Sequence, residues 1–130
     1  MKFTPLVVLF AALATSCGDP ARQLVSITVN PATADAQNFP NGQVQFTATG
    51  TFSDGSKSPI TALWTLNGHF TETAILNIML NSSGMAQCVA GGFVGTGGVF
   101  ATAPADTNIP LTKMTMFTKN VSGTAQITCP

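Results

Sequence analysis

The side chains of this chain that could do chemistry are few, and a thiol near its start is the most informative of them. Cys17 follows three small residues at 14–16. Ahead of these stand a positive charge at Lys2 and an uncharged apolar run over 6–13. A secretory signal peptide has this three-part layout, with small residues at the cleavage site. Because the apolar run is much shorter than the roughly 20 residues that span a bilayer, we expect an exported chain.

The run 14–17 also resembles the lipobox of bacterial lipoproteins. In these proteins the thiol of the cysteine is linked to a diacylglycerol, and the amino terminus created by cleavage is acylated. The resemblance implies a lipoprotein signal peptide over 1–16, palmitate-type chains on Cys17, and a lipidated cysteine with its tether over 17–23. Since glycine and not aspartate follows the cysteine, we expect the outer membrane, at its periplasmic face or the cell surface. The alternative is an ordinary signal peptide that leaves Cys17 as a free or paired thiol.

The other reactive side chains favour structure over catalysis. His69 is the single histidine, so histidines cannot build a zinc cluster. The carboxylates are spread over separate turns, and no Gly-x-Ser-x-Gly nucleophile turn occurs. We therefore expect no enzyme, no metal and no cofactor. An unfamiliar enzyme would need an exposed His69 beside a carboxylate.

The composition restricts the partners. Charged residues make up 8 % of the chain and the formal net charge is zero, whereas a typical domain has about 25 % charged residues. No basic patch is present to neutralise phosphates, so we exclude nucleic acid as a partner. After removal of the leader, the length fits one domain.

Apolar and polar residues alternate along most of the chain after residue 23. A period of two is typical of half-buried strands, and no segment has the apolar stripe of a helix. The expected strands are 25–29, 44–49, 60–66, 75–80, 85–89, 98–103 and 121–129. Seven short strands with turns between them predict an all-β fold, a single Ig-like antiparallel β-sandwich over 24–130. The expected core consists of Val25, Ile27, Val29, Val44, Phe46, Trp64, Val99 and Ile127.

Two cysteines remain, Cys88 and Cys129. In an exported chain they most simply form one disulfide. An Ig-type order runs the fifth and seventh strands in the same direction on opposite sheets, which brings both thiols to one end of the sandwich. The alternative is two separate buried thiols that pack as small apolar side chains.

Two further features each have two interpretations. Trp64 could lie in the core, as in Ig-type folds, or form an exposed platform for a sugar. The connection Pro104–Asn120 is longer than a hairpin needs and carries Leu111, Met114, Met116 and Phe117. These side chains could cover the core as a lid or an added edge strand, or they could form an exposed contact surface for a partner.

Several short motifs, taken in order, resemble the bacterial Ig-like domains of group 2. The motifs are Leu24–Pro31 (LVSITVNP), Gly42–Ala48 (GQVQFTA), Ser53–Gly55 (SDG), Trp64–Thr65, Asn81–Ala86 (NSSGMA) and Gly95–Ala103 (GTGGVFATA). The chain is longer than that pattern around Gly68–Ala74 and over Pro104–Asn120. The resemblance implies a β-sandwich of exported surface proteins of the invasin and intimin type, used as a spacer or adhesive module without catalytic residues.

These observations lead to one functional expectation. We expect a non-catalytic cell-envelope lipoprotein whose domain serves binding, adhesion or scaffolding. Its partners would be the membrane, through the lipid, and another envelope protein or a glycan. The alternative is a carbohydrate-binding accessory module of the cell surface.

Overall fold

The computed structural model describes residues 22–66, 78–90 and 95–130. The signal peptide, Cys17, His69 and the first part of the strand expected at 75–80 lie outside these ranges. The strands are β1 (Leu24–Asn30), β2 (Thr33–Asp35), β3 (Gln43–Gln45), β4 (Thr47–Phe52), β5 (Lys57–Pro59), β6 (Leu63–Leu66), β7 (Ile78–Leu80), β8 (Met85–Cys88), β9 (Gly95–Pro104) and β10 (Asn120–Cys129). Three single-turn 3-10 helices are η1 (Ala36–Asn38), η2 (Pro40–Gly42) and η3 (Leu111–Lys113).

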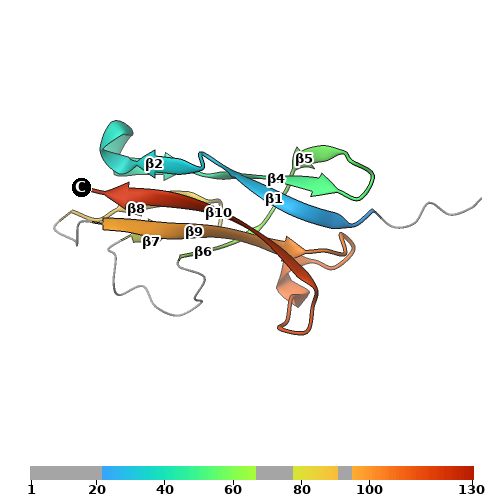
Figure 1. Cartoon of the computed structure of the whole chain (residues 1–130). Helices are drawn as coiled ribbons and strands as arrows, with labels where there is room; N and C mark the ends of the chain where they lie inside the picture. The colour runs from blue at the N-terminus through green and yellow to red at the C-terminus, as the bar shows by residue number, and fades with distance from the viewer. Residues whose placement is uncertain (1–21, 67–77, 91–94) are drawn as a thin grey trace, which may run out of the picture.

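The strands form two layers (Figure 1). In the first layer, β3 pairs with β8, β8 with β7, and β4 lies between β1 and β5. β3 and β4 are one strand interrupted at Phe46, whose N–H donates to the carbonyl of Gly84 at 2.9 Å. The second layer has the order β2–β10–β9–β6. The chain crosses between the layers after Asn30, because β1 pairs with β4 whereas β2 pairs in parallel with β10.

The pairing has the order of a constant-type immunoglobulin sandwich. The sequence β1–β3/β4–β8–β7 corresponds to strands A-B-E-D, and β6–β9–β10 corresponds to C-F-G. β9 and β10 form a ten-residue ladder from Asn120 opposite Pro104 to Cys129 opposite Gly95, without a register shift. The predicted all-β sandwich is therefore confirmed.

The core lies between the two layers and is apolar throughout. Its largest fully buried side chains are Phe46, Ile127, Val44 and Val99. Ile27 and Val29 are buried with them, whereas Trp64 is half-buried and packs against the cluster. No polar or charged side chain is buried within the described ranges. The core therefore draws its stability from the transfer of apolar surface out of water and from close packing.

The core prediction is wrong for Val25, which is 60 % exposed. The register of β1 against β4 shifts between Leu24, opposite Phe52, and Ser26, opposite Thr51. This bulge inserts Val25 as an extra residue, so the inward-facing position passes to Leu24, which is 4 % exposed. A prediction that alternates buried and exposed residues backward from Ile27 places Val25 inside, because it does not account for the extra residue of the bulge.

The boundaries of other strands also differ from the prediction: β4 extends to Phe52 and β9 begins at Gly95. The third expected strand was to begin at residue 60, but β6 begins at Leu63. Ala62 is nonetheless buried, and Ile60 packs against the core from the preceding connection. The short strands β2 and β5 were not predicted, because three residues are too few to show a period.

Cys88 and Cys129 form a disulfide, with their Cα atoms 5.8 Å apart. β8 and β10 run in the same direction in opposite layers and end at the same end of the sandwich, which we call the disulfide end. The pairing follows the geometric expectation. A bridge between residues 41 apart lowers the entropy of the unfolded chain, which stabilises the fold by about 4 kcal/mol in the chain-entropy account.

Gly123 provides a test of how closely the two layers approach. A Cβ atom at this position of β10 would lie 2.8 Å from Cγ2 of Ile27 and still closer to the backbone of Ile27. We expect Gly123→Ala to destabilise the domain by about 1–3 kcal/mol, because backbone cannot yield as a flexible side chain does. Denaturant unfolding measures the change.

The matched control is Gln126→Ala, on the exposed side of the same strand, which should change stability by no more than about 0.5 kcal/mol. An equal effect of the two substitutions would show that β1 and β10 do not pack this closely.

Candidate contact site at the tether end

Three segments that are distant in sequence meet at the end opposite the disulfide. Here β1 begins, β9 ends and β10 begins (Figure 1), and we call this the tether end. The N–H of Leu24 donates to the carbonyl of Ala105 at 2.8 Å, and the N–H of Ala105 donates to the carbonyl of Lys119 at 2.8 Å. The base of the β9–β10 loop is thereby fixed to the first strand.

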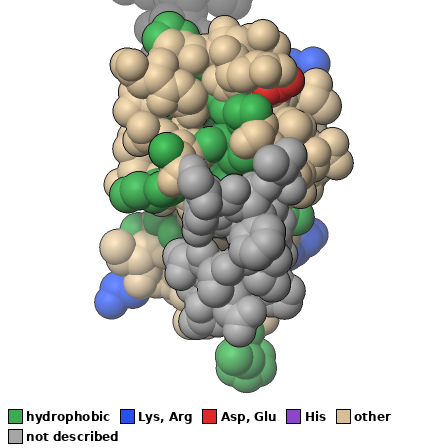
Figure 2. All heavy atoms as spheres, turned by 90° about the vertical axis from the view of Figure 1, so that its left-hand side faces the viewer, with side chains coloured by type: hydrophobic (Ala, Val, Ile, Leu, Met, Phe, Trp, Pro, Cys, Tyr) green, Lys and Arg blue, Asp and Glu red, His purple; other side chains and the backbone are tan. Residues whose placement is uncertain are grey.

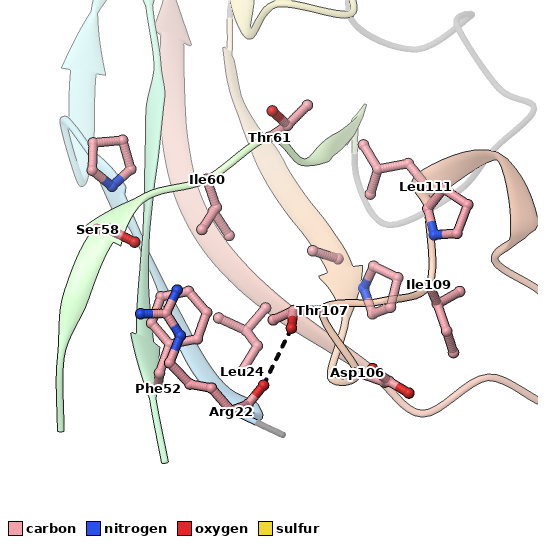
Figure 3. A pocket seen from close by; sticks show the side chains of 14 residues that line it. Arg22, Leu24, Phe52, Ser58, Ile60, Thr61, Asp106, Thr107, Ile109 and Leu111 are labelled. Carbon is pink, nitrogen blue, oxygen red and sulfur yellow. Dashed lines mark hydrogen bonds between the residues drawn. The ribbon is translucent and has the colours of Figure 1, made fainter. Parts of the chain in front are cut away.

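A groove of about 410 Å³ opens at this end, between the β5–β6 connection and the loop after β9 (Figure 3). Its apolar lining comes from β1, β4, β5, β9, η3 and the connections beside them, and includes Leu24, Phe52, Ile60 and Leu111. Polar groups stand among these, notably Arg22. A small apolar group bound in the groove would therefore lie beside the positively charged side chain of Arg22.

Arg22 is held against the domain by three contacts. Its guanidinium carbon lies 3.8 Å from the centre of the Phe52 ring, an arrangement in which the ring face attracts the cation. Its Nη1 donates to Oγ of Ser56 at 3.2 Å. Its backbone carbonyl accepts from Oγ1 of Thr107 at 3.3 Å (Figure 3). The sequence placed Arg22 in the tether, because nothing local signals a partner at Phe52.

The β4–β5 turn beside Arg22 is organised by Asp54. Its Oδ1 accepts from the N–H of Ser56 at 2.9 Å and from the Ser56 hydroxyl at 2.5 Å. These hydrogen bonds from Ser56, the hydroxyl first, lower the pKa of Asp54, and the nearby charge of Arg22 acts in the same direction. The sequence predicted a turn here, and both carboxylate and hydroxyl are used to build it.

The β9–β10 loop divides its four predicted contact residues into two pairs. Leu111 and Met114 are half-buried, and Leu111 packs against the core. Met116 and Phe117 are 89 % and 92 % exposed. The interpretation as a lid therefore describes Leu111, and the interpretation as an exposed surface describes Met116 and Phe117.

Trp64 lies beside a second hollow of about 330 Å³, together with Gln45, Ser82 and Ser83. One edge of its ring packs so closely on Gly84 that a Cβ there would lie 2.8 Å from Cε2 of Trp64. Trp64 is thus partly a core residue and partly the wall of a hollow with hydroxyl and amide groups around it.

Charge is distributed unevenly between the two ends. All four basic residues of the described ranges, Arg22, Lys57, Lys113 and Lys119, lie at or next to the tether end, with Asp54 and Asp106. Asp35 lies level with Thr128, near the disulfide end. In Figure 2, viewed from the disulfide end, the described residues that are visible are mostly uncharged side chains and backbone, and the charged groups lie toward the edges of the view.

No cluster of three or more His, Cys, Asp or Glu side chains in 22–66, 78–90 and 95–130 could hold a metal ion. Within the same ranges, no helix has the length and apolar character needed to cross a membrane.

In comparisons with known proteins, no protein-family model matches the chain, and no curated protein matches it.

The Asp54 turn predicts a pH dependence of stability. The folded-state pKa of Asp54 is below its ordinary value of 3.8, so the turn stabilises the fold above that pH. The stabilisation is lost as the pH falls through the lowered pKa, because the carboxylate must then be protonated. We expect Asp54→Asn to flatten the acid limb of a plot of unfolding free energy against pH.

Ser56→Ala is the matched variant, since it keeps the carboxylate and removes its hydroxyl donor. Its acid limb should be intermediate in slope. An Asp54→Asn protein with the wild-type slope would contradict this account.

Proposed function

We propose that the chain is a non-catalytic lipoprotein of the cell envelope. In this proposal, an Ig-like domain of the group 2 bacterial type is held at the outer membrane by lipid on Cys17, and it serves binding, adhesion or scaffolding. The strand order supports the Ig-like part of the proposal. Acyl chains provide a strong anchor, because each buried methylene contributes about 0.8 kcal/mol.

The observation that carries the proposal is the short distance between Cys17 and the folded domain. Arg22 is already bound to Phe52 and Ser56, and it is five residues after Cys17. A fully extended chain covers at most about 3.6 Å per residue, or about 18 Å here. A lipid on Cys17 would therefore keep the tether end next to the bilayer surface.

The arrangement of the acidic groups at this end supports a role other than catalysis. Asp54 accepts two hydrogen bonds from Ser56, and Oδ1 of Asp106 accepts the N–H of Asn108 at 2.9 Å. Both carboxylates thus stabilise turns.

Metabolic labelling tests the anchor. We expect the wild-type protein to incorporate labelled palmitate in an exporting bacterium and the Cys17→Ser protein to incorporate none, since the thiol is the attachment point. Ser16→Ala is the control, because it keeps a small residue before the cysteine and should label normally. Equal labelling of wild type and Cys17→Ser would refute the lipoprotein assignment.

The hollow beside Trp64 favours a second candidate, a carbohydrate-binding accessory module. An aromatic wall with Gln45, Ser82 and Ser83 around it provides the combination of apolar face and polar groups that orients small ligands. A sugar would stack on the ring and bond to the hydroxyl groups.

A glycan array tests this candidate. Binding should be detectable for the wild type and weakened roughly tenfold, or about 1.4 kcal/mol, in Trp64→Leu. Trp64→Phe is the control for packing, because it retains an aromatic face in the same place and should keep most of the affinity. A wild-type protein that binds no glycan would eliminate the candidate.

A further inference from the structure

We propose that the β9–β10 loop docks on an anionic phospholipid surface, with Met116 and Phe117 inserted between the headgroups and Lys113 and Lys119 facing the phosphates. This inference rests on the proposed function, which keeps the tether end at a bilayer. It adds a second, non-covalent contact that sets the orientation of the domain.

The first step is that the fold holds the two apolar side chains outward. Thr115 and Thr118 close a turn in which the N–H of Thr118 donates to the carbonyl of Thr115 at 3.1 Å. The hydroxyls of Thr115 and Thr118 lie 3.0–3.2 Å from the N–H groups of Phe117 and Thr115, and 3.1 Å from each other. Met116 and Phe117 occupy the two central positions of this turn.

Turn centres are usually small or polar residues, which suit exposure to water. Here they carry the two most exposed large apolar side chains of the described ranges, at 89 % and 92 %. The turn is closed by its own hydroxyl and backbone groups, so its geometry does not require methionine or phenylalanine. Exposed apolar surface at such a place indicates a contact with something outside the domain.

The second step is charge. The segment 107–120 contains Lys113 and Lys119 and no acidic residue, so the apolar pair stands between two cations. Both lysines are exposed. Among the described residues at the tether end, four basic and two acidic residues leave a net charge of +2, and Asp19 in the tether lowers the total to +1. A basic side chain near an anionic membrane contributes about 1 kcal/mol, an attraction that falls off within a Debye length.

The third step is position. The loop lies at the end where β1 begins (Figure 1), and its base is bonded to Ala105, which also accepts from Leu24. The proposed lipid and the loop therefore leave the domain on the same side. Aromatic and long apolar side chains flanked by lysine are the residues that settle at the interface between headgroups and acyl chains. A lipid surface thus fits both the composition and the location of the loop.

Bromolipid quenching tests the docking in the full-length protein, as an exporting bacterium processes it, reconstituted into vesicles. Tryptophan is introduced at the turn as Phe117→Trp, or near the disulfide end as Asn38→Trp. Asn38 is exposed in η1, and the signal of the native Trp64 is subtracted with the wild type. In vesicles of brominated phosphatidylcholine and phosphatidylglycerol, we expect several-fold more quenching at 117 than at 38.

Charge is tested in the same way. The excess quenching at 117 should be lost in vesicles of phosphatidylcholine alone and in the variant Lys113→Glu/Lys119→Glu. If quenching at 117 is the same in these cases, the assignment to anionic headgroups is overturned. If position 117 is quenched no more than position 38 in anionic vesicles, docking itself is overturned, and the exposed pair is left for a protein partner.

Flotation separates this failure from a failure of the anchor. If Cys17→Ser no longer floats with vesicles and position 117 shows no excess quenching, the proposal of a lipid anchor is supported and the proposal of loop docking is refuted. If flotation persists in Cys17→Ser but is lost in Met116→Ser/Phe117→Ser, the proposal of a lipid anchor is refuted and the proposal of loop docking is supported.

Discussion

The fold depends on one apolar interface, the contact between the inner faces of β3–β4 and β9–β10. Phe46 and Val44 from one layer and Val99 and Ile127 from the other are fully buried, with no charged side chain between them. At Gly123 the layers approach so closely that only hydrogen fits against Ile27. Such an interface is stabilised by the apolar area that it buries and by the close packing of its side chains, and not by directional interactions such as hydrogen bonds. The loops contribute partly buried side chains to it, such as Ile60 and Leu111, and the rest of each loop is available for other roles.

This dependence explains which parts of the fold the sequence could predict. Strands that cross the interface bury every second residue, so β1, β3–β4 and β10 were predicted from their alternation. The disulfide followed from strand direction, since β8 and β10 end at the same place. Val25 was misplaced because a bulge changes the phase of β1. The strands β2 and β5 were not predicted because each only adds to the edge of a sheet. Pairing at an edge requires backbone hydrogen bonds but no alternating pattern of side chains.

The candidate site was predictable to a smaller extent. The apolar residues of the long loop and the lysines on each side of them can be seen in the sequence. The sequence does not show that Leu111 points inward while Met116 and Phe117 point outward, because this difference depends on the turn closed by Thr115 and Thr118. The role of Arg22 depends on Phe52, thirty residues away in sequence, and no local signal encodes a contact of that range. Sites assembled from loops of several strands are in general hidden from a linear pattern.

The topology decides which surfaces the domain would offer to a partner if the proposed lipid on Cys17 anchored it. In this strand order the first and last strands run in the same direction, so the chain begins at one end of the sandwich and β10 finishes at the other. An amino-terminal lipid would therefore always turn the β9–β10 loop toward the bilayer and the disulfide end away from it. The four described basic residues lie on the first side together with Asp54 and Asp106, and Asp35 lies on the second. A partner protein or glycan would then be met by the sheet faces, including the hollow beside Trp64, and by the end closed by Cys88 and Cys129.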